Sequence, residues 1–301
     1  MGDMTGKTVV ITGGTSGLGE AMGHALAEMG ADVRLVGRDE AKCRKTAEAI
    51  RARTGNGNVG YYVADLSELA QVRDVARRLR GDLGRLDVLI NNAGAWFTKR
   101  RVSADGIELT WALNHLAYFL LTNELLDLLK DTAAAHGEAR IINQSSSAHE
   151  NADIHWDDIE FEHSWDTAGK GALGPGWAVY AQSKLANLLF TFALARDLEG
   201  TGVTANAVHP AVVVTGFSQN NGLLYKLAAP IRRLGNKRTP REGAEPAIHL
   251  ASAPEARGVT GAYLGPPRRE ETPSAIAHDR KVQERLWRLS ERMVGEAAAA
   301  A

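Results

Sequence analysis

The sequence predicts an α/β fold in which short apolar strands alternate with amphipathic helices. Lys7 to Ile11, KTVVI, is a short β-branched run, and the glycine-rich stretch after it passes into helical periodicity. The same order of strand, turn and helix repeats along the chain, and polar residues stand where several strands end. Strands separated by helices pair in parallel, so we expect an open sheet that binds its ligand at the carboxyl edge.

Length and composition limit the classes of function. The 301 residues suffice for one elaborated domain. With 35 Lys+Arg against 36 Asp+Glu there is no basic footprint for nucleic acid, which favours a small-molecule partner. Cys43 is the only cysteine, so an internal disulfide is excluded and a reducing, cytoplasmic location is expected. No stretch of eighteen apolar residues or signal-peptide pattern occurs, so no membrane span is expected.

The first turn, TGGTSGLG, is a candidate phosphate site. Gly13, Gly17 and Gly19 let a ligand approach the backbone, and free amides at a helix N-terminus attract anions. The spacing is GxxxGxG rather than GxGxxG, and a tight turn without a ligand also uses glycine. The turn therefore indicates a dinucleotide site only together with other motifs.

The second strand, Asp32 to Val36, ends where a dinucleotide fold meets the adenosine ribose. An acid there accepts a hydrogen bond from the 2′-hydroxyl of NAD, whereas an arginine holds the 2′-phosphate of NADP. Because Gly37 stands at the strand end and Arg38 follows, we predict NADP(H) over NAD(H). Alternatively, Arg38 only solvates the start of the helix that runs to Arg53, and Asp39 is its N-cap.

Two further strands, Val59 to Ala64 and Arg85 to Ile90, also end in polar residues. Asp65 either contacts adenine or caps the helix from Ser67 to Arg80. NNAG follows the fourth strand, and its asparagines suit a loop that bonds backbone groups and holds neighbouring strands. We expect Asn91 to be structural even in a working enzyme.

Ser103 to Lys130 has apolar residues at helical spacing, which predicts one long helix. Asn114 and His115 interrupt its apolar middle. A buried asparagine needs partners, so Asn114 either bonds the backbone or serves water and proton traffic. His115 is interpreted as a core histidine rather than a ligand.

The fifth strand, Arg140 to Gln144, delivers three serines, 145–147, to the same edge. The segment from Ala148 to Gly176 then breaks the alternation and contains Trp156, Trp165 and three histidines. Its histidines and acids lack a close metal-ligand spacing, so no metal site is expected. A lid or substrate wall is the preferred interpretation, because long loops in compact domains usually carry function.

Trp177 to Glu199 is predicted to be the next helix, with Tyr180 and Lys184 four residues apart on one face. An ammonium beside a phenol favours the phenolate, so Lys184 is expected to lower the pKa of Tyr180 and make it an acid/base. Alone, the pair is weak support, because this spacing occurs on many solvated helices.

The remaining sequence predicts further strands and helices, with no linker between two domains. Pro210 and Thr215 follow the sixth strand, and 216–238 is interpreted as a mobile flap over the pocket rather than a membrane-surface helix. The predicted elements are the strands Gly202 to His209 and Val259 to Leu264 and the helices Thr239 to Ser252 and Ala275 to Val294.

Together these motifs resemble those of the short-chain dehydrogenases/reductases, in the same order along nearly the whole chain. The shared motifs are TGGTSGLG, NNAG, Asn114, NQSS and YAQSK. The segments DGIELTWALNHLAYFLLT, SSSAHENADIHWDD, YAQSKLANLLF, NAVHP and LWRLSERMVG are most similar to the retinol-dehydrogenase-like branch.

The resemblance implies a single Rossmann-type domain over residues 1–301, with a doubly wound, mainly parallel seven-stranded sheet and helices on both faces. It implies that Tyr180 is the acid/base and that Lys184 lowers its pKa and bonds the nicotinamide ribose. Ser146 would hold the substrate oxygen, and Asn114 would support a water-linked proton relay. The implied cofactor contacts are Gly13, Thr15, Ser16, Gly17, Leu18, Gly19, Arg38, Asp65, Leu66, Asn92, Ala93, Gly94, Tyr180, Lys184, Pro210, Val213 and Thr215.

Three departures limit the resemblance. Pro210-Ala211 stands where the family has Pro-Gly. The stretch from Ser146 to Tyr180 is longer than expected, so the loop is interpreted partly as an insertion at about 148–176. The triple serine leaves Ser145 as a second choice for the substrate contact.

Family members often pair through two long helices, here 103–130 and 177–199, so a homodimer is one expected assembly.

The sequence thus predicts an NADP(H)-dependent oxidoreductase that interconverts a ketone or aldehyde and an alcohol on a bulky apolar or aromatic substrate. A dedicated ketoreductase of polyketide-like natural-product biosynthesis is the alternative within the same class. A dinucleotide-sensing protein with vestigial catalytic residues is more distant, because all four catalytic residues are present.

Overall fold

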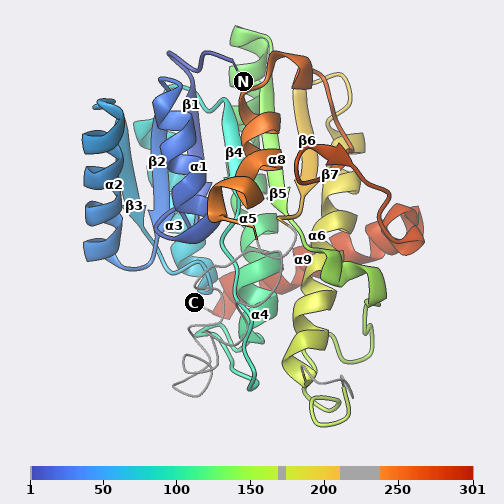
Figure 1. Ribbon diagram of the computed structural model, residues 1–301. Helices are drawn as coiled ribbons and strands as arrows, with labels where there is room; N and C mark the ends of the chain where they lie inside the picture. Colours follow the sequence, from blue (N-terminus) through green and yellow to red (C-terminus); the bar gives the residue numbers. More distant parts are fainter. Residues whose placement is uncertain (1, 169–173, 211–237, 301) are drawn as a thin grey trace.

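The computed structural model describes residues 2–168, 174–210 and 238–300. One eight-stranded sheet organises them in the spatial order β3-β2-β1-β4-β5-β6-β7-β8 (Figure 1). Neighbouring strands are parallel except for β7 and β8. The direction of winding reverses between β1 and β4, where open α/β sheets bind ligands. The strands are β1 (Thr8–Thr12), β2 (Asp32–Gly37), β3 (Val59–Val63), β4 (Val88–Asn91), β5 (Ala139–Gln144), β6 (Val203–Val208), β7 (Tyr263–Gly265) and β8 (Arg269–Glu270).

Helices cover both faces of the sheet (Figure 1). α1, α2 and α8 pack on one face, and α3, α5 and α6 pack on the other, where α9 adds a layer against α3 and α6. The helices are α1 (Gly17–Glu28), α2 (Glu40–Thr54), α3 (Leu69–Asp82), α4 (Leu109–Trp111), the π-helical turn η1 (Ala112–Leu116), α5 (Ala117–His136), α6 (Pro175–Asp197), α8 (Pro240–Ser252), α9 (Arg280–Ala300) and the short 3₁₀ turns η2 (Ser147–Asn151), η5 (Pro254–Ala256) and η6 (Ala275–His278).

The strand sequences explain why both faces are covered. Along β1, Val9 and Ile11 belong to the core under α1 and α8, whereas Val10 belongs to the core under α3 and α5. All three are fully buried. Successive strand residues point to opposite faces, so an uninterrupted apolar strand requires helices on both sides.

The long helix predicted from Ser103 begins six residues later. Glu108 is its N-cap and accepts a hydrogen bond from the Trp111 amide at 2.8 Å. The residues before it form a turn instead, because Gly106 has a positive φ of 78° and Val102 pairs with Glu108 in an antiparallel bridge. Apolar spacing alone therefore placed the start too early.

Other boundaries differ as well: α5 ends at His136 rather than Lys130, and α9 ends at Ala300 rather than Val294. β7 begins at Tyr263 rather than Val259, and the eighth strand, β8, follows it as a short antiparallel addition to the seven predicted strands. The predicted Asp39 cap is confirmed, because its side chain accepts from the Lys42 amide at 3.0 Å. At α8, Thr239 forms a capping box with Glu242 that was not predicted.

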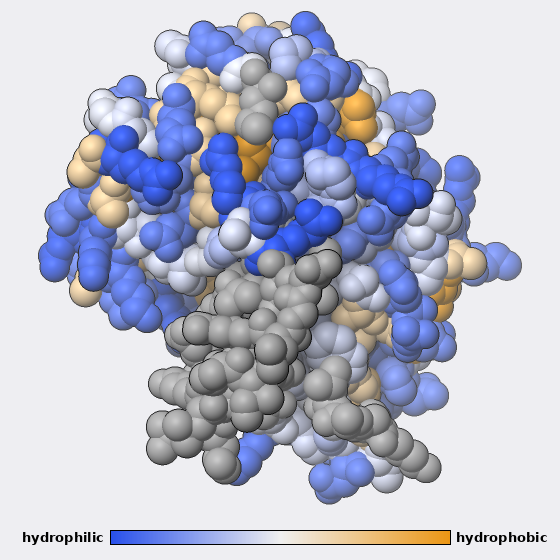
Figure 2. Space-filling view, viewed as in Figure 1, coloured by the Kyte–Doolittle hydropathy of each residue, from blue (hydrophilic) through white to orange (hydrophobic). Residues whose placement is uncertain are grey.

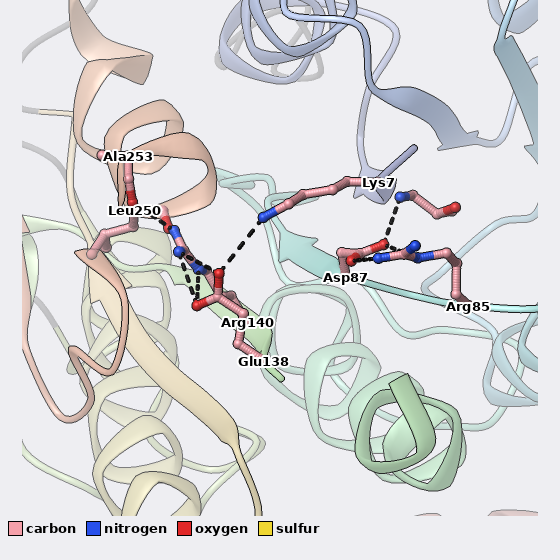
Figure 3. A network of polar contacts seen from close by, with 8 residues as sticks. Lys7, Arg85, Asp87, Glu138, Arg140, Leu250 and Ala253 are labelled. Atoms are coloured by element: carbon pink, nitrogen blue, oxygen red, sulfur yellow. Dashed lines mark hydrogen bonds and ion pairs between the residues drawn. The ribbon is translucent and has the colours of Figure 1, made fainter. Parts of the chain in front are cut away.

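The amino-terminal edge of the sheet is held by a network of charges (Figure 3). Arg140 binds both carboxylate oxygens of Glu138 and donates to the carbonyl oxygens of Leu250 at 2.8 Å and Ala253 at 3.1 Å. It thereby joins β5 to the end of α8. Buried guanidinium groups need partners in several directions, and Arg140 has them.

The face seen in Figure 2 is mostly hydrophilic, with small apolar areas between the charged side chains. Within the described ranges, no helix combines the length and apolar character needed to cross a bilayer.

Candidate active site

The turn after β1 is shaped to receive a phosphate. Gly13 and Gly17 have positive φ angles of 64° and 57°, which favour glycine. A Cβ on Gly19 would lie 2.2 Å from the Gly13 carbonyl oxygen, so only glycine allows α1 to start this close to the turn. Ser16 and Leu18 line the cleft at the positive end of the α1 dipole.

The end of β2 has no room for an acidic side chain. A Cβ on Gly37 would lie 2.8 Å from both Sγ of Cys43 and Cγ2 of Thr15. Arg38 is exposed and lines the cleft, as does Lys42 in the first turn of α2. The cleft thus has two cationic side chains beside the position where NAD-binding proteins place a carboxylate.

The loop after β4 is tied to β1 through Thr12, a residue that sequence reasoning missed. The Thr12 hydroxyl oxygen accepts from the amides of Asn92 at 2.8 Å and Ala93 at 3.0 Å. The Asn92 side chain donates to the Thr12 carbonyl at 2.8 Å. A polar β-branched residue directly before the glycine-rich turn was the available signal. These bonds hold Ala93 and Gly94 against the cleft.

Asn91 is structural, as predicted. Its side-chain amide donates to the Thr122 hydroxyl and to the side-chain oxygen of Asn143, both at 2.9 Å. Asn143 in turn donates to the Thr191 hydroxyl at 3.0 Å. The bonds connect β4 and β5 to the helices behind them, and Asn91 does not line the cleft.

Ser146, rather than Ser145, bonds the side chain of Tyr180. The Ser145 hydroxyl donates to the carbonyl oxygen of Lys184 at 2.8 Å. Ser146 forms a hydrogen bond with the Tyr180 phenol and caps η2 by accepting from the Ala148 amide at 3.2 Å. The structure thus places Ser146 beside the phenol, and its contact with substrate stays a prediction.

Tyr180 and Lys184 lie on the buried side of α6, 8% and 2% exposed. The Lys184 ammonium donates to the Gln144 carbonyl at 3.0 Å and lies 5.7 Å from the centroid of the Tyr180 ring. Burial lowers the pKa of Lys184 to about 7, because the charged form loses its hydration.

The expected lowering of the Tyr180 pKa is wrong for this structure. Burial raises the pKa of Tyr180 to about 12, and the Ser146 hydrogen bond offsets only part of that effect. Lys184 cannot reverse the shift, because burial penalises its own charge as well. Both buried groups therefore favour their neutral forms relative to water.

Asn114 lies in the π-helical turn η1 and is fully buried. Its side-chain oxygen accepts from the Ala95 amide at 2.9 Å, and its nitrogen donates to the Ala95 carbonyl and the Ser183 hydroxyl, both at 3.0 Å. Of the two interpretations left open, bonding to the backbone is thus observed. π-helical turns recur at functional sites.

His115 is a core histidine, as predicted. It is fully buried, and Nε2 lies 2.8 Å from the Ser290 hydroxyl of α9. Burial lowers its pKa to about 3, so the imidazole is neutral at physiological pH.

These parts surround a cleft of about 380 Å³ along the carboxyl edge of the sheet. Gly19 and Asn114 lie behind its lining, and Val213, Thr215 and nearly all of 216–238 lie outside the described residues. Asp65 lines the cleft, and its side chain accepts from the Ser67 amide at 3.0 Å. The N-cap of α3 is Glu68 rather than Asp65. The predicted residues that line it are Gly13, Thr15, Ser16, Gly17, Leu18, Arg38, Asp65, Leu66, Asn92, Ala93, Gly94, Ser146, Tyr180, Lys184 and Pro210.

Two more groups at the site escaped sequence reasoning. The Gln144 carbonyl accepts from both Lys184 and, at 3.1 Å, the side chain of Asn187. Ser183 links Asn114 to α6. A backbone carbonyl has no sequence signal, whereas the position of Ser183 beside Lys184 in the YAQSK motif is a signal for this serine.

Aromatic side chains adjoin Tyr180 at the first turn of α6. The Trp177 ring lies 5.2 Å from the Tyr180 ring and contacts Trp96 edge to face at 5.5 Å. A Cβ on Gly176 would lie 1.9 Å from the Phe97 carbonyl oxygen, so glycine allows α6 to approach this loop. Trp177 is a partly exposed apolar surface beside the phenol.

Comparison with known proteins identifies the class. The short chain dehydrogenase family model matches residues 7–157, and a model described as enoyl-(acyl carrier protein) reductase matches 165–265. The chain belongs to the short-chain dehydrogenase/reductase family, whose members are oxidoreductases that use a nicotinamide dinucleotide.

Within that family the chain is retinol-dehydrogenase-like. Retinol dehydrogenase 14 from Homo sapiens is 40% identical over 98% of this chain and 88% of its own length. Polyprenol dehydrogenase from Homo sapiens is 36% identical over 96% and 85%.

Solved structures agree with the fold. An uncharacterised protein from Mycobacterium paratuberculosis has a TM-score of 0.74 at 31% identity, covering 98% of this chain and 96% of that one. The Pseudomonas aeruginosa RhlG/NADP complex has a TM-score of 0.69 at 28% identity, covering 89% and 98%. The 3-ketoacyl-(acyl-carrier-protein) reductase from Brucella melitensis, complexed with NADH, has 0.66 at 26%, covering 88% and 99%.

Proposed function

We propose that this protein is an NADP(H)-dependent oxidoreductase that interconverts a ketone or aldehyde and an alcohol on a bulky apolar or aromatic substrate. The observation that carries the proposal is the hydrogen bond between Ser146 and Tyr180 in the cleft, with the Lys184 ammonium behind them. Hydride addition to a carbonyl builds negative charge on oxygen. Two positioned hydroxyl donors stabilise that charge.

The proposed roles follow from these positions. Tyr180, neutral at physiological pH, donates its proton to the substrate oxygen in the reductive direction, and Ser146 donates a second hydrogen bond to the same oxygen. Lys184 stabilises the tyrosinate that forms and bonds the nicotinamide ribose. Asn114 supports a proton relay, because its side-chain oxygen and the Lys184 ammonium lie close to the same residue, Gly94. A Cβ built on Gly94 would lie 3.2 Å from that oxygen and 3.5 Å from the ammonium. When bound, the nicotinamide supplies the hydride.

The cleft fits a dinucleotide with a 2′-phosphate. The glycine turn and the N-terminus of α1 would hold the pyrophosphate. Gly37 leaves no space for a carboxylate at the end of β2, and Arg38 and Lys42 would bind the 2′-phosphate. Pro210 lines the cleft, and Val213 and Thr215 are proposed contacts of the nicotinamide end.

The relatives suggest which substrates to try first. Their names specify retinol and polyprenol, both apolar isoprenoid alcohols, and Trp177 beside Tyr180 offers an apolar contact for such a chain or for a ring. The loop at about 148–176 is proposed as part of the substrate wall and 216–238 as its flap.

A panel of carbonyl compounds tests the proposal. The purified chain is mixed with NADPH and, in turn, retinal, polyprenal, aromatic ketones and small aliphatic ketones, and NADPH absorbance is followed. Turnover of bulky carbonyls above small ones supports the proposal. NADPH binding without turnover of any carbonyl would favour the dinucleotide-sensing alternative instead.

The natural-product ketoreductase remains the second candidate, because the Brucella melitensis 3-ketoacyl reductase shares the fold at 26% identity. Thioester-bound β-ketoacyl substrates added to the same panel separate the two. Preference for those thioesters over isoprenoid aldehydes would select the ketoreductase.

A homodimer stays a prediction. α9 covers part of the expected interface, since the Trp287 ring lies 5.1 Å from Phe119 of α5 and 5.6 Å from Phe190 of α6. Light scattering of the purified chain gives the oligomeric state directly.

A further inference from the structure

Tyr118 is a fully buried aromatic residue of α5 whose ring lies near the Lys184 ammonium. The Lys184 ammonium lies 5.5 Å from the centroid of the Tyr118 ring, compared with 5.7 Å from that of Tyr180. A cation within about 6 Å of an aromatic centroid is attracted by the negative face of the ring. The ammonium thus lies near two rings contributed by two different helices.

In the part of the chain that the structure describes, no acidic side chain pairs with the Lys184 ammonium. None of the ion pairs found among the described residues includes Lys184. The groups around it are the Gln144 carbonyl of β5, the rings of Tyr118 and Tyr180, and His115 of η1, whose imidazole is neutral. One carbonyl satisfies only one of the three ammonium donors.

We propose that Tyr118 is a positioning residue for Lys184, and that the face of its ring holds the ammonium in its charged form beside Tyr180. A cation is strongly disfavoured in a buried site without an electrostatic partner. The ring supplies that partner without a carboxylate, whose charge would compete with the tyrosinate for the ammonium. The effect on catalysis rests on the proposed function, but the effect on Lys184 does not.

The ring, rather than the hydroxyl, carries the role. The Tyr118 hydroxyl oxygen is buried and has no hydrogen-bond partner within the described part of the chain. Burial, with Tyr180 nearby, raises the pKa of Tyr118 well above its ordinary value, so it is neutral at any physiological pH. Phenylalanine at position 118 should therefore serve Lys184 as tyrosine does.

Nuclear magnetic resonance of the full chain labelled with ¹³Cε-lysine tests this without any turnover. The Lys184 signal is assigned by its loss in Lys184→Arg and titrated between pH 5 and 10. The wild type should titrate near pH 7. Tyr118→Phe should keep that midpoint, whereas Tyr118→Leu should lower it by about one unit, a tenfold change in acidity, because the charged form loses the ring.

Phe119→Leu is the matched control, because this neighbouring ring packs on Phe190 and Trp287 instead of Lys184. It should lose stability and leave the Lys184 midpoint unchanged. If Tyr118→Leu does not fold, phenylalanines with one to five ring fluorines at position 118 replace it. Each fluorine reduces the negative electrostatic potential on the face of the ring and changes the shape of the ring little. The Lys184 midpoint should therefore fall stepwise as fluorines are added.

Two results would overturn the proposal. The first is an unchanged Lys184 midpoint in folded Tyr118→Leu or across the fluorinated series. The second is a shift in Tyr118→Phe as large as that in Tyr118→Leu, which would assign the role to the hydroxyl. A shifted midpoint in a protein that reduces no carbonyl would refute the proposed function and keep this inference. Where the protein turns over a carbonyl, kcat/KM should fall as the pH rises through the midpoint of Lys184. In each variant, the pH of this fall should shift together with the midpoint measured by nuclear magnetic resonance.

Discussion

At the amino-terminal edge of the sheet, buried charges have several polar partners each. At the carboxyl edge, the partners that the described residues give the charge of Lys184 are one carbonyl and two aromatic rings. Arg140 binds a carboxylate and two backbone carbonyls, and Asp87 accepts from the Thr8 amide and from Arg85, both at 2.8 Å (Figure 3). Lys184 donates one hydrogen bond to Gln144.

The difference separates groups that stabilise the fold from a group to which the proposed function gives a role in the reaction. Full pairing holds a charge in one protonation state over a wide pH range, which suits a joint between β5 and α8. Burial lowers the pKa of Lys184 to about 7, where both protonation states are accessible. We expect substitutions at the two edges to affect stability and catalysis in opposite ways.

The largest effect is expected for Tyr180→Phe. It removes the proposed proton donor and leaves the ring in place, so kcat for carbonyl reduction should fall roughly 10²-fold to 10⁴-fold while NADPH affinity is retained. Tyr62→Phe is the control, because its hydroxyl bonds Asp82 outside the cleft. Undiminished turnover in Tyr180→Phe, measured by NADPH absorbance, would remove Tyr180 from the mechanism.

Next in size is Arg140→Met at the opposite edge. It leaves Glu138 and two backbone carbonyls without their cation, so the free energy of unfolding should fall by about 3 kcal/mol. Urea denaturation measures this change. Arg77→Met, at an exposed ion pair with Asp74, should cost well under 1 kcal/mol. If Arg140→Met reduced kcat rather than stability, the assignment of this edge to structure would be wrong.

Lys184→Met should stabilise the protein, by about 2 kcal/mol at pH 6. The folded-state pKa of Lys184 is about 7, below its ordinary 10.5. Between pH 7 and pH 10.5 Lys184 is protonated in the unfolded chain and mainly neutral in the folded protein. Raising the pH therefore disfavours the unfolded state and increases the free energy of unfolding of the wild type. The difference between variant and wild type should therefore shrink towards pH 10. Urea denaturation at pH 6, 8 and 10 measures it, and a difference independent of pH would contradict the burial argument.

The smallest effect is on cofactor choice. Arg38→Ala should lower the ratio of kcat/KM for NADPH to that for NADH by about tenfold, because a charge-assisted contact to the 2′-phosphate is lost. Arg53→Ala is the control, since its ion pair with Glu28 is exposed and outside the cleft. An unchanged ratio in Arg38→Ala would refute the proposed NADP(H) preference.

Much of the site could be predicted because its signals are local. The glycines of the first turn, the Asp39 cap and the pairing of Tyr180 with Lys184 on one helix face all depend on residues within a few positions of each other. Such patterns follow from backbone geometry, which the neighbouring sequence controls.

The start of the long helix and the serine register were not fixed locally. Apolar spacing extended the helix back to Ser103, but a glycine turn and the Glu108 cap moved its start to Leu109. Only the approach of α6 shows that Ser145 bonds the Lys184 carbonyl and leaves Ser146 for Tyr180.

The sequence by itself thus determined the order of the motifs and the α/β architecture, and it predicted Tyr180 and Lys184 as the reacting pair. Tertiary structure decided the direction of the Tyr180 pKa shift, the lack of space at Gly37 and the ring of Tyr118 beside Lys184. The physical reason is that burial, steric exclusion and contact with a ring depend on which segments pack together. Tyr118 and Lys184 are far apart in the sequence, and only the packing of α5 against α6 brings them together.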